Sequence, residues 1–420
     1  MTVLAETPSA PAVAAPRAAG GGGRTARALL YAFVLLIPIE TVDFLGGGGD
    51  GRVVTLSRIA GGLLLGAALA DWRRGVRRVP AAFWLIAWYV AAYSLSQLRV
   101  PPRLDSLFLA KQVILVYSLG LFLVAANLFR DSAFRSAILR FYGWWTALVA
   151  AGMLAGVFGT VYLGEAGRDT ILGQDPNVAA GFFAAAAVCL AGDPGLTRRA
   201  LSLRGALSLA AVAGLVLAII HTGSRGGLAV FVAGAAGLAL CGSRATRGTR
   251  ALMAAGALAV LGALMVREFQ NRTIVAGRLI NTWESGDTAG RGQIYGAAWK
   301  LVQERPLLGY GGANNFSRLG EELNHPEGRV FYRDTHNLPL AVLTEVGIVG
   351  AAPLAAAVLL LLLQAWRHGR RTGDARPFAL MCAVLALNAS LTGSNQNLFW
   401  VVLAAAAACG METETAVRAS

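Results

Sequence analysis

Two arginines lie in polar, glycine-rich motifs between apolar segments, where they could bind a phosphate ester. Arg225 belongs to the motif His221-Thr-Gly-Ser-Arg-Gly-Gly227. Its glycines let backbone N–H groups approach a ligand, and a guanidinium can hold phosphate with two hydrogen bonds. An arginine that only reaches lipid headgroups is the structural alternative. Arg291 opens a predicted helix, and a helix N-terminus also favours anions.

A histidine that could move a proton stands in the motif Asp334-Thr-His-Asn-Leu-Pro339. A histidine side chain can accept a proton at neutral pH, so His336 is a candidate general base. The alternative is a polar residue that only hydrogen-bonds the start of a helix. Neighbouring Asp334 and Asn337, and Glu345 further along the same predicted helix, favour the functional interpretation.

Further cations stand near or within apolar segments. Lys111 lies in LFLAKQVILVY and needs either an anionic ligand or burial against a carboxylate, and both remain open. Arg168 precedes the turn Asp175-Pro-Asn177, which alone is ordinary turn chemistry. The four cysteines have no CxxC spacing and no nearby histidine, so they indicate neither a metal site nor a disulfide framework. Cations without a metal-ligand set indicate a phosphate-bearing substrate and no cofactor.

The composition requires a membrane around these residues. Of the 420 residues 56% are hydrophobic and 14% are charged, with a mean hydropathy of +0.57. A soluble domain has about 25% charged residues. General disorder is therefore excluded, and nucleic-acid binding is disfavoured despite a net charge of +14. Apolar runs of membrane-spanning length predict an all-α polytopic membrane protein with about twelve transmembrane helices, or eleven, at residues 28–45, 53–70, 80–97, 106–129, 138–160, 177–192, 205–222, 226–241, 251–266, 337–363, 378–394 and 397–410.

The basic residues predict the orientation. With the N-terminus inside, 21 basic residues fall in cytoplasmic segments and six in the short segments opposite. Cytoplasmic loops retain Lys and Arg, so both termini should be cytoplasmic. We expect a disordered cytoplasmic tail at 1–27, with the first apolar run retained as a span. Nine spans would lie in 28–266 and three in 337–410, followed by a cytoplasmic tail at 411–420.

A long polar loop, residues 267–336, interrupts the apolar pattern on the extracytoplasmic side. Within it, Gly290–Gln303 predicts an amphipathic helix that Pro306 ends. Leu307–Gly312 supplies a turn, and a second short helix and turn are expected over 321–328. Functional residues concentrate on such loops, so we look for the chemistry here. The apolar face of the first helix consists of Ile294, Ala297, Ala298 and Leu301.

Three stretches of the chain resemble the signature of the O-antigen ligase family, which also contains O-antigen polymerases and O-linking oligosaccharyltransferases. They are Gly290–Trp299, Glu304–Phe316 and Thr335–Gly350. The turns Thr222–Gly227 and Asp175–Asn177 resemble other motifs of the family. With about twelve spans and a large outer loop late in the chain, the resemblance covers nearly the whole protein.

The resemblance implies a metal-independent membrane glycosyltransferase of the C type (GT-C) in the bacterial inner membrane. Its active site would face the periplasm, with a large periplasmic loop between the ninth and tenth spans. The donor would be a glycan on undecaprenyl diphosphate. The acceptor would be a sugar hydroxyl of lipid A–core, which places the protein in lipopolysaccharide biosynthesis. Membrane lipids are the other expected partners.

The resemblance also assigns roles to residues. The functional arginines of the family map onto Arg225 and Arg291, with Arg278 as a rival for the second, and the functional histidine maps onto His336. Glu345 matches a family position that we interpret as structural. The residues expected to bind substrate are Arg168, Asn177, Ser224, Lys111, Arg278 and Asn337.

The expected chemistry follows from these side chains. Two arginines would stabilise the diphosphate leaving group as its charge grows. His336 would deprotonate or orient the acceptor hydroxyl, and attack from the opposite face would invert the anomeric configuration. A polymerase would use the same donor with a second lipid-linked oligosaccharide as acceptor, and a protein-directed or other surface-glycan transferase is a further alternative. A transporter would instead need inverted halves and discontinuous helices near the midplane, a symmetry that the sequence lacks.

Overall fold

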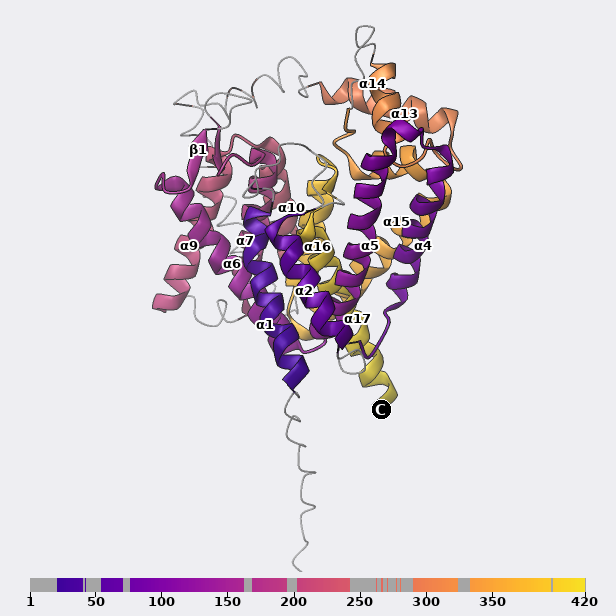
Figure 1. Ribbon diagram of the computed structural model, residues 1–420. Helices are drawn as coiled ribbons and strands as arrows, with labels where there is room; N and C mark the ends of the chain where they lie inside the picture. The colour runs from indigo at the N-terminus through magenta and orange to yellow at the C-terminus, as the bar shows by residue number, and fades with distance from the viewer. Residues whose placement is uncertain are drawn as a thin grey trace, which may run out of the picture.

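Long apolar segments fold into helices because backbone polar groups inside a membrane need partners within their own segment. The computed structural model describes residues 21–40, 42, 54–70, 76–161, 168–194, 202–241, 290–323, 333–393 and 396–419, with five isolated positions between 262 and 280. Most helices run between two ends of one bundle (Figure 1). At one end, which we call the terminal end, α1 begins and α17 ends, and the opposite end is called the loop end. The helices are α1 (Gly21–Leu36), α2 (Leu56–Ala70), α4 (Ala81–Leu95), α5 (Asp105–Leu128), α6 (Ser132–Leu154), α7 (Pro176–Ala191), α9 (Leu203–His221), α10 (Arg225–Leu240), α13 (Arg291–Glu304), α14 (Asn314–Glu322), α15 (Leu338–Thr372), α16 (Arg376–Asn388) and α17 (Asn397–Ala419).

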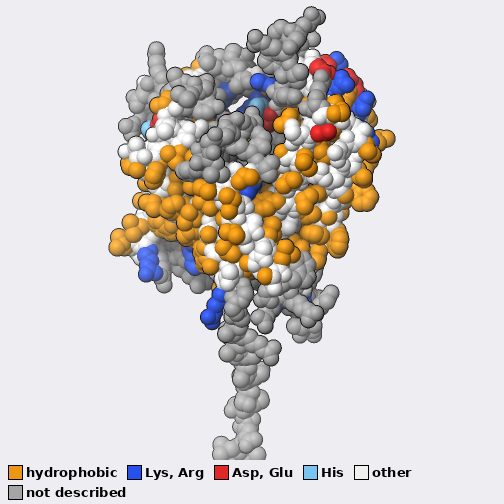
Figure 2. All heavy atoms as spheres, in the orientation of Figure 1, with side chains coloured by type: hydrophobic (Ala, Val, Ile, Leu, Met, Phe, Trp, Pro, Cys, Tyr) orange, Lys and Arg blue, Asp and Glu red, His pale blue; other side chains and the backbone are white. Residues whose placement is uncertain are grey.

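The described helices confirm an all-α polytopic membrane class. Five are long and apolar enough to cross a membrane, and five more are shorter and apolar. On the face shown in Figure 2, hydrophobic side chains form a band across the middle of the bundle, and charged side chains gather mostly at its two ends. Eleven of the predicted segments coincide with helices, whereas 251–266 lies outside the described residues apart from two isolated positions. Twelve membrane crossings therefore stay a prediction. The five long helical segments are Ala81–Arg99, Asp105–Leu128, Ser132–Leu154, Leu203–His221 and Leu338–Thr372.

A short antiparallel hairpin at the loop end departs from the purely helical prediction. Strand β1 (Gly159–Val161) pairs with β2 (Asp169–Ile171), so that Thr160 lies opposite Thr170. The threonine hydroxyl of β1 also accepts a hydrogen bond from the N–H of Gly173 at 2.8 Å. Two three-residue strands are too short to give a periodic signal, which is why apolar periodicity did not predict them.

Helix α7 lies at the centre of the bundle and fixes the position of α10. Every residue from Val178 to Leu190 is buried, and the helix packs against α6, α9, α10 and α16. Small residues allow this close approach. A Cβ added at Gly227 of α10 would lie 2.4 Å from the Cβ of Ala180, and one at Gly234 would lie 2.3 Å from a methyl group of Val188. The start of α10, where Arg225 lies, is therefore held rigidly.

Helix α15 is interrupted one-quarter of the way along, although the sequence predicted a continuous span. At Gly347 the φ of 59° and ψ of −166° are not helical. In an unbroken helix each N–H donates to the carbonyl four residues earlier. The break therefore separates the N–H groups of Ile348 and Val349 from the carbonyls of Thr344 and Glu345.

The segment Pro306–Gly311 inserts its own backbone into this gap. The carbonyls of Pro306 and Leu307 accept hydrogen bonds from the two freed N–H groups at 2.8 and 3.2 Å. The N–H groups of Tyr310 and Gly311 donate to the two freed carbonyls at 2.8 and 2.9 Å. Two helical hydrogen bonds are thus replaced by four, and no backbone group at the break loses its partner. We call this arrangement of Pro306–Gly311 with residues 344–349 the α15 splice.

Glycines make the α15 splice sterically possible. A Cβ at Gly347 would lie 2.3 Å from the carbonyl carbon of Leu307, and one at Gly309 would lie 2.6 Å from the carbonyl of Glu345. Both glycines also have positive φ, at 59° and 63°. The predicted turn at Leu307–Gly312 is therefore confirmed, and its glycines serve the close approach of two backbones.

The helix predicted at Gly290–Gln303 is found as α13, whereas the second helix, predicted over 321–328, is found as α14 and lies mostly before that range. The two helices share a small core of their own. Residues Ile294, Ala298 and Leu301 of α13 are buried, as the amphipathic pattern predicted, whereas Ala297 is half-buried. They pack with Tyr310 and Leu319 in a cluster separate from the main core. Helix α14 begins at Asn314, earlier than predicted. The loop helices therefore have their own packing, and the α15 splice joins them to the bundle.

Candidate active site

Arg225 is the first residue of α10 and is half-buried. The preceding Ser224 caps the helix, because its side chain accepts a hydrogen bond from the N–H of Gly227 at 3.0 Å. Gly223 has a φ of 66°, which allows the sharp turn from α9. This turn presents Arg225 at a helix N-terminus, where the helix dipole and the guanidinium both favour an anion.

Three of the residues predicted to bind substrate brace this turn. The Nε of Arg168 donates to the carbonyl of Thr222 at 2.8 Å, and its Nη2 donates to Oδ1 of Asn177 at 3.0 Å. The same oxygen of Asn177 accepts a hydrogen bond from Ser224 Oγ at 2.9 Å. Arg168 and Ser224 are buried. Their contacts support the Arg225 turn, and a direct contact with substrate stays a prediction.

His336 lies in the strained turn that precedes α15. Its φ is 49°, which is unusual for a residue with a side chain. Nδ1 lies 3.8 Å from Oδ2 of Asp334, and the His336 side chain is 39% exposed. Asn337 caps α15 through a hydrogen bond from the N–H of Leu340 to its Oδ1 at 3.0 Å. An accessible imidazole beside a carboxylate suits a general base.

Arg291 is the first residue of α13 and is half-buried. One turn later, the hydroxyl of Tyr295 donates to the carbonyl of His336 at 3.3 Å and to that of Ala389 at 3.2 Å. The start of α13 therefore lies beside the His336 turn. Like Arg225, Arg291 stands at a helix N-terminus.

All three elements meet at the turn after α16, residues Ala389–Thr392. The carbonyl of Ala389 accepts from Asn337 Nδ2 at 3.1 Å as well as from the tyrosine of α13. Thr392 Oγ1 donates to Oδ1 of Asp334 at 2.7 Å. A Cβ at Gly226, next to Arg225, would lie 3.0 Å from Ser390 Oγ. The starts of α10, α13 and α15 thus contact one turn at the loop end.

The space-filling view is hollowed at the loop end, and cationic and histidine side chains are visible in this recess (Figure 2). Two arginines at helix N-termini supply positive charge for a diphosphate, and His336 supplies a group that can accept a proton. No group of three or more His, Cys, Asp or Glu side chains that could hold a metal ion occurs in the described part of the chain.

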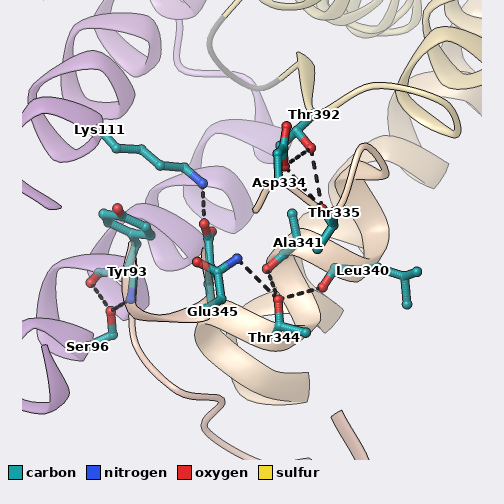
Figure 3. Close-up of polar contacts among 12 residues, drawn as sticks. Tyr93, Ser96, Lys111, Asp334, Thr335, Leu340, Ala341, Thr344, Glu345 and Thr392 are labelled. Carbon is teal, nitrogen blue, oxygen red and sulfur yellow. Dashed lines mark hydrogen bonds and ion pairs between the residues drawn. The ribbon is translucent and has the colours of Figure 1, made fainter. Parts of the chain in front are cut away.

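Lys111 has a carboxylate partner inside the bundle. Its Nζ donates a hydrogen bond to Oε1 of Glu345 and forms an ion pair with it, and both side chains are almost fully buried (Figure 3). Of the two alternatives that the sequence left open, burial against a carboxylate is the one found. The substrate-binding role predicted for Lys111 is therefore not supported, whereas the structural interpretation of Glu345 agrees with the contact.

Two predicted site residues remain, Arg278 and Asn337, and the structure describes only Asn337. Arg278, the rival for the second arginine, lies outside the described residues, as does most of the loop before Gly290. Asn337 is at the site, where its side chain hydrogen-bonds the backbone of α15 and of Ala389. Its contact with substrate stays a prediction.

Sequence reasoning missed several residues of the site. Tyr295 lies inside the same motif as Arg291, and its position one helical turn later is the signal in the sequence that could have indicated it. Thr392 falls inside the predicted span 378–394, but α16 ends at Asn388, so the last residues of that span form a polar turn instead. His221 Nδ1 and Asp169 Oδ2, 3.0 Å apart, form another exposed histidine–aspartate pair at the same end, which is not part of the site.

The fold and the site define a polytopic helical membrane protein with cationic helix N-termini at one end. Residues 209–355 match the family model for O-antigen ligase. This match confirms the resemblance to the O-antigen ligase family over that segment. The matched segment includes Arg225, Arg291 and His336. No curated protein matches the chain.

Proposed function

We propose that this protein is an O-antigen ligase of the bacterial inner membrane. It transfers a glycan from undecaprenyl diphosphate to a sugar hydroxyl of lipid A–core, at the periplasmic face and without a metal ion. The loop end would face the periplasm, because the excess of basic residues lies in segments assigned to the opposite side. The donor lipid would remain in the outer leaflet during the reaction.

One observation carries the proposal, namely the meeting of three helix starts at the α16 turn. Arg225 and Arg291 each open a helix there, and His336 precedes the third. An anionic leaving group, bound by two guanidinium groups and two helix dipoles, would lie close to a proton acceptor. A glycosyl diphosphate with an attacking hydroxyl needs this combination of groups.

The reaction would proceed by a single displacement. The acceptor oxygen attacks the anomeric carbon, the bond from that carbon to the phosphate oxygen breaks, and the configuration inverts. The hydroxyl proton passes to His336, and undecaprenyl diphosphate leaves with its charge stabilised by Arg225 and Arg291. Asp334, 3.8 Å from His336 Nδ1, would stabilise the imidazolium that forms.

A transporter is the alternative from a different class. It would need discontinuous helices that line a path at the midplane. The described residues contain one broken transmembrane helix, α15, and its gap is filled by the backbone of Pro306–Gly311. The break therefore serves the attachment of the loop helices, which favours the enzyme.

Lipopolysaccharide from a strain without this protein tests the ligase against the polymerase. A ligase defect leaves full-length glycan on the lipid carrier and none on lipid A–core. A polymerase defect instead leaves single repeats attached to core. Single repeats on core would contradict the ligase proposal. Unchanged lipopolysaccharide in a strain with no second ligase would contradict both.

A further inference from the structure

Lys111 and Glu345 are charged, buried and unused by the proposed chemistry. Lys111 is 6% exposed and Glu345 is fully buried. Lys111 Nζ lies 5.4 Å from the ring centre of Tyr93 and 5.9 Å from that of Phe316. Burying two charges costs several kcal/mol per ion unless the geometry is good, so such a pair calls for a role beyond stability.

Glu345 belongs to the α15 splice. Its backbone carbonyl accepts the hydrogen bond from Gly311, and its side chain extends to Lys111 on α5. The adjacent Thr344 contributes in the same way, because its carbonyl accepts from Tyr310 and its hydroxyl accepts from Asn315 of α14 at 3.3 Å. Figure 3 shows Glu345 and Thr344 side by side between α5 and the loop.

The second carboxylate oxygen of Glu345, Oε2, has no hydrogen-bond partner within the part of the chain that the structure describes. Lys111 is therefore the side chain that fixes this carboxylate. Since Lys111 lies on α5, in the main bundle, the pair joins the bundle to the splice by a specific contact as well as by packing.

The splice connects the two elements that carry the proposed catalytic groups. Helix α13, with Arg291 at its start, leads into Pro306–Gly311, and the first part of α15 follows directly on His336. A movement of the splice would change the separation between the arginine and the histidine. A displacement of about 1 Å far from the chemistry can cost about a hundredfold in rate.

We propose that Lys111 and Glu345 are a positioning pair that holds the α15 splice and thereby sets His336 against Arg291. The inference rests on the proposed transferase function. It predicts an effect on the rate of the bound complex and little effect on donor binding, since neither side chain reaches the substrate. A direct contact of Lys111 with the substrate would instead make its loss raise the donor KM and leave kcat nearly unchanged.

The test uses the full-length protein with both charges removed at nearly constant volume, in Lys111→Met/Glu345→Gln. The same substitutions in the exposed pair of α13 and α14, Lys300→Met/Glu322→Gln, are the matched control, because those side chains lie 2.5 Å apart on the surface. We expect kcat to fall about a hundredfold and the donor KM to change by less than about threefold. The control should keep parental kinetics.

A second measurement does not depend on activity. Spin labels on Gln293 of α13 and Leu359 of α15, both exposed, report the distance between the loop helices and the bundle. We expect this distance distribution to broaden in the double variant and to stay narrow in the control. An inactive parent protein would overturn the proposed function, whereas the label distances would still test the positioning pair.

Two results would overturn the positioning role. One is parental kcat with a parental distance distribution, and the other is a raised donor KM with unchanged kcat, which would indicate a substrate contact. Should the double variant fail to accumulate in the membrane, the milder Glu345→Gln carries the same test, with kcat expected to fall about tenfold. Parental kinetics and distances in that variant would overturn the proposal.

Discussion

His336 combines an unusual backbone with a reactive side chain. A non-glycine residue at positive φ costs on the order of 1–3 kcal/mol, and such strain persists only where the surroundings impose it. Here Thr335 Oγ1 donates to the carbonyl of Asn337 at 3.1 Å, and Tyr295 donates to the carbonyl of His336 itself. The surrounding contacts therefore hold the backbone of the turn that presents the imidazole.

We expect His336→Ala to lower kcat for glycan transfer by about 10²–10⁴, because a positioned base contributes this much. His221→Ala is the matched control, since His221 is also paired with an aspartate at the loop end. It should retain most of the activity. Initial rates with saturating donor and acceptor measure both variants. Equal losses for the two histidines would contradict a specific role for His336.

Arg225 and Arg291 should need the planar guanidinium as well as the charge. We expect Arg225→Lys and Arg291→Lys each to lower kcat/KM for the donor by about tenfold or more, because lysine cannot hold a phosphate with two parallel hydrogen bonds. Arg318→Lys, on the exposed face of α14, is the control and should be neutral. Full activity of either site variant would remove that arginine from the site.

At the scale of elements, the α15 splice explains why glycines stand at 309 in the loop segment and at 347 in α15, where the two backbones meet. We expect Gly347→Ala to lower the free energy of unfolding by about 1–3 kcal/mol, because its φ is positive and its Cβ would meet Leu307. Gly296→Ala on α13 has open space around it and should be neutral or stabilising. Thermal unfolding in detergent compares them. Equal stability of the two variants would contradict the splice.

The turn between α15 and α16 is held by an ion pair at the terminal end. Arg376 donates to both carboxylate oxygens of Asp374 at 2.8 and 2.9 Å and to Ser136 Oγ of α6 at 2.8 Å. Burial raises the pKa of Asp374, but the Arg376 guanidinium and its hydrogen bonds lower this pKa by more than burial raises it. The pKa of Asp374 therefore lies below its ordinary 3.8. The pair therefore stabilises the fold above pH 3.8, and this contribution declines as the pH falls below that value.

We expect Asp374→Asn to cost about 3 kcal/mol near neutral pH, because it removes the nearer of the two carboxylates beside a buried arginine and leaves only Asp193, 4.0 Å away. The difference from the parent protein should shrink as the pH falls below about 4. Unfolding measured across this pH range checks both statements, with Glu321→Gln in the exposed pair on α14 as control. A difference that does not change with pH would contradict the assignment.

At the scale of the whole molecule, the sequence predicted the helices well. An apolar run inside a membrane forms a helix because a helix satisfies every backbone hydrogen bond within its own segment. The sequence also predicted α13, since Ile294, Ala298 and Leu301 repeat at helical spacing. The sequence did not predict the partner of Lys111, because Glu345 lies 234 residues away along the chain. No local pattern records such a contact. The hairpin and the insertion at Gly347 depend in the same way on backbone pairing between distant segments.

The predicted site residues divide according to their environment. Arg225, Arg291 and His336 stand at the starts of helices, and glycines or polar caps in the sequence mark those positions. Arg168 and Ser224 have the same residue types as a binding site, yet their partners are other protein groups. Residue type alone does not separate a side chain that binds substrate from one that braces the site.

Glycan transfer by the reconstituted protein tests the ligase function most directly. The donor is an oligosaccharide on undecaprenyl diphosphate, the acceptors are lipid A–core and a second lipid-linked oligosaccharide in separate reactions, and a chelator removes divalent metal. We expect glycan on lipid A–core, release of undecaprenyl diphosphate, and loss of both in His336→Ala. Transfer only to the second lipid-linked glycan would contradict the ligase assignment. No transfer to either acceptor would contradict the enzyme itself.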